Sequence, residues 1–256
     1  MKDIVNCAKK YCELLLNEDF SEFCGFSVSK RRHVLAAFAN LSRFLGRYED
    51  FKRLLKEYGL KWESTKVEDL LISRLSKAES DVSVLEWAKT VRERFPRFAV
   101  FIEFVTVSGL RLVEALDSYN LIIDLNQKGR LTEYYKAEKE SLEHFRFKEI
   151  FIRNNKKAFL SFVPRELIEK VSTQKEKFTA SLIYDCIKRQ GVKPRFNDLR
   201  EYYATFMTRF LSQSEIDFLQ GRVSGSVFMR NYFNPALISD LKERVFNGIA
   251  DIEAHL

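Results

Sequence analysis

The chain has 256 residues, of which 46% are hydrophobic and 31% charged, so it can bury one large core or two smaller ones. Nine glycines and four prolines leave little room for low-complexity or collagen-like sequence. A formal net charge of +7 favours a polyanionic partner.

Targeting segments and metal motifs are not expected. The start, Met1-Lys2-Asp3, lacks the basic-then-apolar pattern of a secretory signal, and no run of about 18 apolar residues predicts a membrane span. The four cysteines have neither disulfide-framework nor zinc-ribbon spacing, and the three histidines are scattered. We therefore expect a cytoplasmic protein with reduced thiols, no metal and no cofactor.

Apolar residues recur at helical spacing throughout the first eighty residues. The predicted helices cover Ile4–Leu15, a segment capped by Ser27 or Ser29 that ends at Gly46, Tyr48–Tyr58, and the region of Leu70 to Leu75. We interpret residues 1–80 as a small helical domain, joined through the polar stretch 77–83 to a second domain over residues 81–256.

The second domain is predicted to be helical apart from one hairpin. Phe145–Phe151 alternates at the strand period, residues 154–157 read as the turn, and Ala158–Val163 as the returning strand. Helices are predicted over 84–107 with a break near Pro96, and over 110–119, 166–171, 179–190, 196–212, 214–219 and 236–252. The predicted fold class is mainly α with a small antiparallel sheet in the second domain.

Residues that could carry chemistry lie in loops or at helix starts. Arg111 heads a helix with Glu114 one turn later, where the carboxylate can orient the guanidinium around a bound phosphate. An arginine snorkelling from a core helix would give the same pattern. Lys156 and Lys157 lie at the predicted hairpin tip, where lysines are often present only for solubility.

Further along the chain, Asn197 and Arg200 are three residues apart and face the same way at a helix start. Gly221-Arg222 follows, and ten residues later Tyr232 stands in a polar segment. A tyrosine there is a candidate nucleophile, although tyrosines more often serve packing.

Taken in order, Gly-Leu-Arg-x-x-Glu, the hairpin lysine, the Arg200 helix, Gly221-Arg222 and Tyr232 resemble the tyrosine recombinases, the phage-integrase family. The sequence is most similar to the integrases encoded by archaeal viruses and plasmids. The resemblance spans essentially the whole chain. It implies a two-domain clamp on double-stranded DNA, with residues 1–80 as the core-binding domain and 81–256 as the catalytic domain.

The resemblance also assigns roles. Tyr232 corresponds to the nucleophile, Arg111 and Arg200 to the two catalytic arginines, and Lys156 to the hairpin lysine, with Lys157 close enough to be kept as a second candidate. Two positions depart from the family pattern, because Asn197 stands where His or Lys is usual and Arg222 where His or Trp is usual. Asn197 cannot exchange a proton at neutral pH and Arg222 stays charged.

The implied reaction is cleavage and rejoining of DNA through a 3′-phosphotyrosyl intermediate, without ATP or metal, for integration or excision of a mobile element. Candidate phosphate-binding residues of the first domain are Lys30, Arg31, Arg32, Arg43, Arg47, Lys52 and Arg53. Leu237, Leu241, Val245, Ile249 and Ile252 form an apolar stripe suited to exchange between protomers of a homotetramer, or to packing within one protomer.

Two other interpretations stay open. A catalytically degenerate relative would bind and bend DNA as an architectural protein, with Asn197 as the relic of lost chemistry. A basic helical adaptor outside the family would bind RNA or protein, and would leave the ordered series of arginines, lysine and tyrosine as coincidence.

Overall fold

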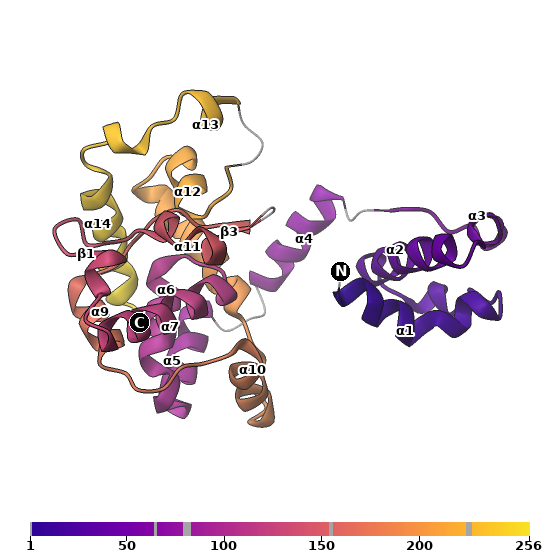
Figure 1. Cartoon of the computed structure of the whole chain (residues 1–256), viewed down its shortest axis with the longest axis horizontal. Helices are drawn as coiled ribbons and strands as arrows, with labels where there is room; N and C mark the ends of the chain where they lie inside the picture. The colour runs from indigo at the N-terminus through magenta and orange to yellow at the C-terminus, as the bar shows by residue number, and fades with distance from the viewer. Residues whose placement is uncertain (1, 64–65, 79–82, 154–155, 224–226) are drawn as a thin grey trace. The chain divides into compact units, whose positions relative to one another are not determined.

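The computed structural model describes the chain apart from residues 1, 64–65, 79–82, 154–155 and 224–226 (Figure 1). It divides into two compact units, Met1–Asp81 and Val82–Leu256, each with its own hydrophobic core. Helices dominate both units, and short antiparallel strands occur in the second. The predicted fold class, mainly α with a small antiparallel sheet, is confirmed. Among the described residues, no helix is both long and apolar enough to cross a membrane.

All the regular secondary structure in the described residues of the first unit is helical. Its elements are α1 (Lys2–Leu16), η1 (Ser21–Gly25), α2 (Val28–Phe44), α3 (Tyr48–Glu57) and α4 (Val67–Ala78). Ser27 caps α2, because its side chain accepts a hydrogen bond from the backbone N–H of Lys30. The core is aromatic, with Phe20 and Phe38 fully buried and their ring centroids 5.6 Å apart.

The second unit contains ten α-helices in the part of the chain that the structure describes. They are α5 (Val84–Arg94), α6 (Ala99–Ser108), α7 (Leu112–Gln127), α8 (Lys148–Phe151), α9 (Arg165–Ser172), α10 (Ala180–Arg189), α11 (Phe196–Phe206), α12 (Gln213–Leu219), α13 (Val227–Asn231) and α14 (Leu241–Glu253). Short 3-10 turns separate several of them: η2 (Pro96–Phe98), η3 (Leu131–Glu133), η4 (His144–Arg146), η5 (Met207–Arg209) and η6 (Pro235–Leu237).

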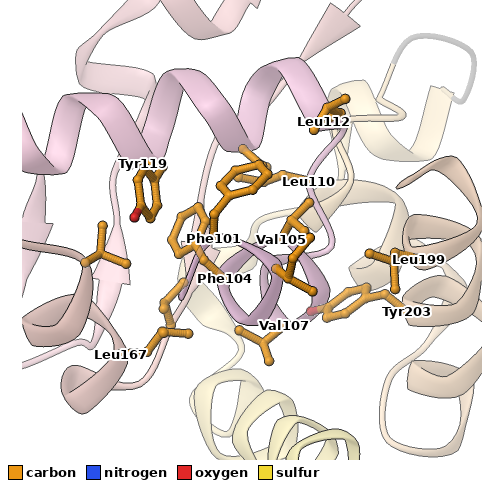
Figure 2. Close-up of a cluster of buried hydrophobic side chains, with 14 of the residues drawn as sticks. Phe101, Phe104, Val105, Val107, Leu110, Leu112, Tyr119, Leu167, Leu199 and Tyr203 are labelled. Carbon is orange, nitrogen blue, oxygen red and sulfur yellow. The ribbon is translucent and has the colours of Figure 1, made fainter. Parts of the chain in front are cut away.

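Helix α6 is the centre of the second unit. It packs against α5, α7, α9, α11 and α14. Phe101, Ile102 and Val107 lie on different sides of the helix by its step of about 100° per residue, and all three are buried; Phe101 and Val107 are drawn in Figure 2. A helix that is apolar all round must be covered all round, which this arrangement achieves. The helix ends at Gly109, whose φ of +63° is left-handed, and the ring of Tyr203 packs where a Cβ would stand.

The strands form two small antiparallel sheets. One has the order β1 (Tyr135–Lys136), β2 (Ser141–Leu142), β5 (Ser161–Phe162), and the other pairs β3 (Ile152–Arg153) with β4 (Lys156–Lys157). Strands β1 and β2 were not predicted from the sequence, because two-residue strands carry too little periodicity to be recognised.

The predicted strand over Phe145–Phe151 is wrong, because this segment forms η4 and α8. The alternation of apolar and charged residues holds only from Phe145 to Lys148 and breaks at Glu149 and Ile150. Phe145 is 41% exposed, whereas His144 is fully buried. The imidazole of His144 lies 2.6 Å from the Tyr134 hydroxyl and 2.9 Å from the Ser161 hydroxyl. These long-range hydrogen bonds, rather than alternation, decide which side of the segment faces the core.

Three further elements differ from the predictions. Lys156 and Lys157 belong to strand β4 instead of a turn, opposite Arg153 and Ile152 respectively, and the rest of the predicted turn lies outside the described residues. Only 161–162 of the predicted returning strand 158–163 is a strand. The predicted last helix is divided into η6 and α14, and the apolar face of α14 is buried in the core of its own unit, while Leu237 is 80% exposed.

Candidate active site

Arg200 is the buried centre of the candidate site. It lies on α11, and only 7% of the residue is exposed. Its Nη1 donates to the carbonyl of Gly109 at 2.8 Å and its Nη2 to the carbonyl of Gln220 at 2.6 Å. The carbonyl groups come from the turn before α7 and the end of α12, so this one guanidinium joins three distant segments.

Arg111 and Glu114 form the second part of the site. Arg111 is the N-cap residue of α7, and its backbone N–H donates to the Glu114 carboxylate at 3.2 Å. Its Nη1 is 2.7 Å from Oε1 of Glu114, and Nη1 of Arg200 is 3.9 Å from Oε2. One carboxylate that is 1% exposed therefore faces two guanidinium groups.

Arg222 completes a group of three arginines. Its backbone N–H donates to the carbonyl of Asp217 at 2.7 Å, and its Nη1 lies 3.9 Å from the Asp217 carboxylate. Burial, together with the positive charges of Arg111 and Arg222, lowers the pKa of Arg200 to about 10 against the opposing effect of Glu114. The local excess of positive charge makes this an anion-binding arrangement.

Strand β4, which contains Lys156 and Lys157 and is called the lysine strand below, packs directly on the arginine segment, the turn Gly221-Arg222. Gly221 has a φ of +65°, and a Cβ built on it would stand 1.6 Å from the backbone oxygen of Lys157. Only glycine lets β4 approach this closely. The contact brings the strand that contains Lys156 and Lys157 beside Arg222, with Lys156 exposed and Lys157 half-buried.

Two of the site residues predicted from the sequence, Asn197 and Tyr232, are exposed. Asn197 is exposed in the first turn of α11, one turn before Arg200. Tyr232 follows α13 and is 74% exposed, and its backbone N–H donates to the carbonyl of Phe228 at 2.9 Å. Among the described residues, no hydrogen bond joins its hydroxyl to an arginine. The ring lines a hollow of about 340 Å³ together with residues that include Ser212 and Leu237.

Gln220 and Asp217 were not identified from the sequence. Gln220 is 1% exposed, its carbonyl accepts from Arg200, and its side-chain amide donates back to the carbonyl of Arg200 at 3.0 Å. A polar residue directly before Gly221-Arg222 was the available signal, because such a side chain needs partners once it is buried.

In the first unit, the candidate DNA-binding residues fall into two groups. Arg47 and Arg53 both pair with Glu18, each at 2.6 Å, and Lys52 pairs with Glu49 at 2.7 Å. These charges are already partly neutralised. Arg43 stacks on the ring of Tyr48, as given by its 4.4 Å distance to the ring centroid.

The start of α2 is different. The ammonium of Lys30 lies 3.5 Å from the ring centroid of Phe26, and an Arg31 guanidinium nitrogen donates to the Phe26 carbonyl. Arg32 is exposed and makes no ion pair with any residue that the structure describes. Phosphate binding by these residues stays a prediction, and the start of α2 has the more available charge.

Comparison with known proteins gives one match. A family model described as archaeal phage integrase matches residues 77–245, a range that includes the arginines, both lysines, Asn197 and Tyr232. Neither a curated protein nor a solved structure matches the chain.

Proposed function

The chain belongs to the archaeal phage integrase family, and we propose that it is a tyrosine recombinase that cleaves and rejoins double-stranded DNA for integration or excision of a mobile element. In this proposal the Tyr232 oxygen attacks a backbone phosphorus, the bond to the 5′-oxygen breaks, and a 3′-phosphotyrosyl link forms. A 5′-hydroxyl of a second strand then attacks the link and releases the tyrosine. Each step exchanges one phosphoester for another, so neither ATP nor metal is required.

The observation that carries this proposal is that Arg111 and the buried Arg200 face the same Glu114 carboxylate, while Arg200 also binds the carbonyl of Gln220, two residues before Arg222. The pentacoordinate transition state concentrates negative charge on its non-bridging oxygens, and preformed cationic donors stabilise that charge. Removal of one such donor typically costs about 2.7 to 4 kcal/mol of transition-state stabilisation. Glu114 and the two backbone carbonyls hold the arginines in place before DNA arrives, so little reorganisation is needed.

The leaving 5′-oxygen needs a proton, and the strand β4 supplies the candidate acids. Lys156 is the first candidate and Lys157 the second, because the contact of β4 with Gly221 holds both beside Arg222. In the same proposal Asn197 donates a hydrogen bond to a phosphate oxygen without exchanging a proton.

Tyr232 has to approach the phosphate from an exposed position. We propose that DNA binding brings the tyrosine segment over the arginines, with Lys30, Arg31 and Arg32 among the residues that grip the duplex. Assembly of four protomers on DNA through exchange of the C-terminal helix belongs to the same proposal. In this structure the apolar face of α14 packs on its own unit, so exchange would replace each cis contact by an equivalent contact in trans.

The test uses a library of nicked duplexes with a randomised central region, in which a short product strand diffuses away after cleavage and traps the covalent complex. Strands recovered with the protein after denaturation and protease digestion are then sequenced. We expect a defined site and an adduct that Tyr232→Phe abolishes. Absence of any adduct across the library, with retained DNA binding, would instead favour the architectural DNA-binding relative.

Matched variants distinguish residues needed for cleavage from residues needed for DNA binding. Arg111→Lys should abolish cleavage and leave salt-dependent DNA binding in place, whereas combined alanine changes at Lys30, Arg31 and Arg32 should weaken binding and reduce its salt dependence. Arg165→Ala is the control for loss of a positive charge, because Arg165 is exposed and its ion pair is with Glu169, one turn along the same helix.

A further inference from the structure

A series of aromatic rings connects the tyrosine segment, residues 227–233, to the chain just beyond strand β4. The ring of Phe233, the residue after Tyr232, lies 5.7 Å from the ring of Phe218 on α12. The ring of Phe218 in turn stacks on Phe159 at 6.0 Å and an interplanar angle of 8°. Phe159 is two residues beyond Lys157, so Phe218 contacts both segments that the proposed reaction must bring together.

The sequence neighbours of Phe218 hold the arginines. Asp217 accepts from the backbone of Arg222, and the carbonyl of Gln220 accepts from Arg200. Helix α12 and the residue that follows it therefore position the two arginines through backbone carbonyl groups, while the Phe218 ring contacts the other two segments.

Contacts within the tyrosine segment join Phe233 to the residues just before it, and the ring of Phe228 lies 6.0 Å from the ring of Phe233. The backbone N–H groups of Tyr232 and Phe233 both donate to the carbonyl of Phe228 at 2.9 Å, which fixes the two residues relative to each other. Met229 is buried, but Phe228 is 49% exposed. A hollow of about 670 Å³ lies on the Phe218 side, and the hollow of about 340 Å³ lies against the tyrosine.

We infer that Phe218 is a positioning residue that sets the place of Tyr232 relative to Lys156, Lys157 and the arginines, an inference that rests on the proposed function. It acts through Phe233, because displacement of the Phe233 ring moves the adjoining tyrosine backbone. An aromatic ring is required at position 218, since the ring stacks on Phe159 and meets the tilted ring of Phe233 at 50°, two ring contacts that an aliphatic side chain cannot make. Misplacement of a reacting group by about 1 Å is enough to cost about 100-fold in rate.

The experiment compares three variants of the full-length chain. Phe218→Leu removes the ring and keeps the apolar character, and Phe218→Tyr keeps an aromatic ring and adds a hydroxyl. Phe162→Leu is the matched control, because Phe162 is half-buried, borders the same hollow and pairs with the ring of Phe246, 6.4 Å away, instead of the tyrosine segment.

Two measurements are made on each variant, with thermal unfolding as the check on folding. Hydrogen exchange reports the amides of Tyr232 and Phe233 without DNA. Adduct formation is timed at saturating DNA, on a trapped-site duplex and on the same duplex with sulfur replacing the bridging 5′-oxygen. A thiolate leaves without a proton, so the sulfur substrate restores variants that lack the acid but not those with a misplaced nucleophile.

For Phe218→Leu we expect faster exchange at both amides and adduct formation slowed about 10- to 100-fold, with the DNA dissociation constant within about twofold of the wild type. Phe218→Tyr should recover most of the rate, and Phe162→Leu should stay within about threefold. The sulfur substrate should restore Lys156→Ala or Lys157→Ala, whichever is the acid, but leave Phe218→Leu slow.

The inference is overturned if Phe218→Leu and Phe162→Leu slow the reaction equally, if Phe218→Leu weakens only DNA binding, or if exchange at the two amides is unchanged. A wild-type protein that forms no adduct would instead overturn the proposed function, and the inference with it. Those two failures are thus distinguished by the wild-type control.

Discussion

Replacement of Gly221 by alanine tests whether the contact between β4 and the arginine segment sets the site. The added Cβ would stand 1.6 Å from the oxygen and 2.5 Å from the carbon of the Lys157 carbonyl. Both are backbone atoms, so rotation of a side chain cannot relieve the clash. Strand β4 or the Gly221 turn has to move.

The cost has two parts. A left-handed alanine costs about 1 to 2 kcal/mol of folding free energy. Restoring an ordinary carbon–oxygen contact of about 3.3 Å also requires a movement of roughly 1.7 Å, and overpacking of this kind typically costs about 1 to 3 kcal/mol. Gly191→Ala supplies the control, because Gly191 has a φ of +72° in the same unit and nothing lies within 4 Å of the point where its Cβ would stand, so it incurs only the first cost.

The assay measures the free energy of unfolding by urea titration and the rate of adduct formation at saturating DNA. We expect Gly221→Ala to lose about 1 to 3 kcal/mol more than Gly191→Ala. Its adduct formation should slow about 100-fold, because the lysines of β4 move away from Arg222. Equal stability losses and equal rates in the two variants would show that the close approach of β4 does not organise the site.

Three other predictions concern charge. Arg244 forms a bidentate ion pair with the carboxylate of Glu215, which lowers the pKa of Glu215 from 4.5 to about 2. The resulting stabilisation is complete above pH 4.5 and is lost as the pH falls toward 2. Glu215→Gln should therefore lower the unfolding free energy at neutral pH by about 2 to 3 kcal/mol, and an unchanged acid-unfolding profile would contradict this. Burial lowers the pKa of His144 from 6.5 to about 3, so the unfolded chain binds one more proton between these values. This group should lower the unfolding free energy by about 1.4 kcal/mol per pH unit on acidification below 6.5, and urea titrations of His144→Gln between pH 6.5 and 4.5, above the range in which Glu215 titrates, should lack that slope. Sulfate should raise the melting temperature of the wild type because it relieves repulsion around Arg200, whereas an equal rise in Arg200→Ala would place the anion elsewhere.

The local features of the site could be predicted from the sequence. Arg111 and Glu114 are three residues apart, so the geometry of the first helical turn suffices to bring them together, and the structure shows that contact. Helices with regular apolar spacing were found for the same reason, since their periodicity is a property of a short window. The order of arginines, lysine and tyrosine was likewise visible in the chain without any knowledge of contacts.

The segment 145–151 shows where local reasoning fails. The alternation of Phe145 to Lys148 indicates a strand, but the segment forms helical turns, with His144 buried and hydrogen-bonded to Tyr134 and Ser161. Those partners are distant in sequence, and no short window around position 145 contains both.

The sequence by itself determined the helical character of the chain and the residues available for chemistry, because both depend on side-chain type and near spacing. Only the tertiary structure decided that Arg200 is buried between the carbonyl groups of Gly109 and Gln220, and that β4 packs on Gly221. It also decided that α14 covers its own core while Tyr232 is exposed. These outcomes depend on contacts between segments far apart in the chain, and the free energy of such contacts is set by burial and packing that no local pattern encodes.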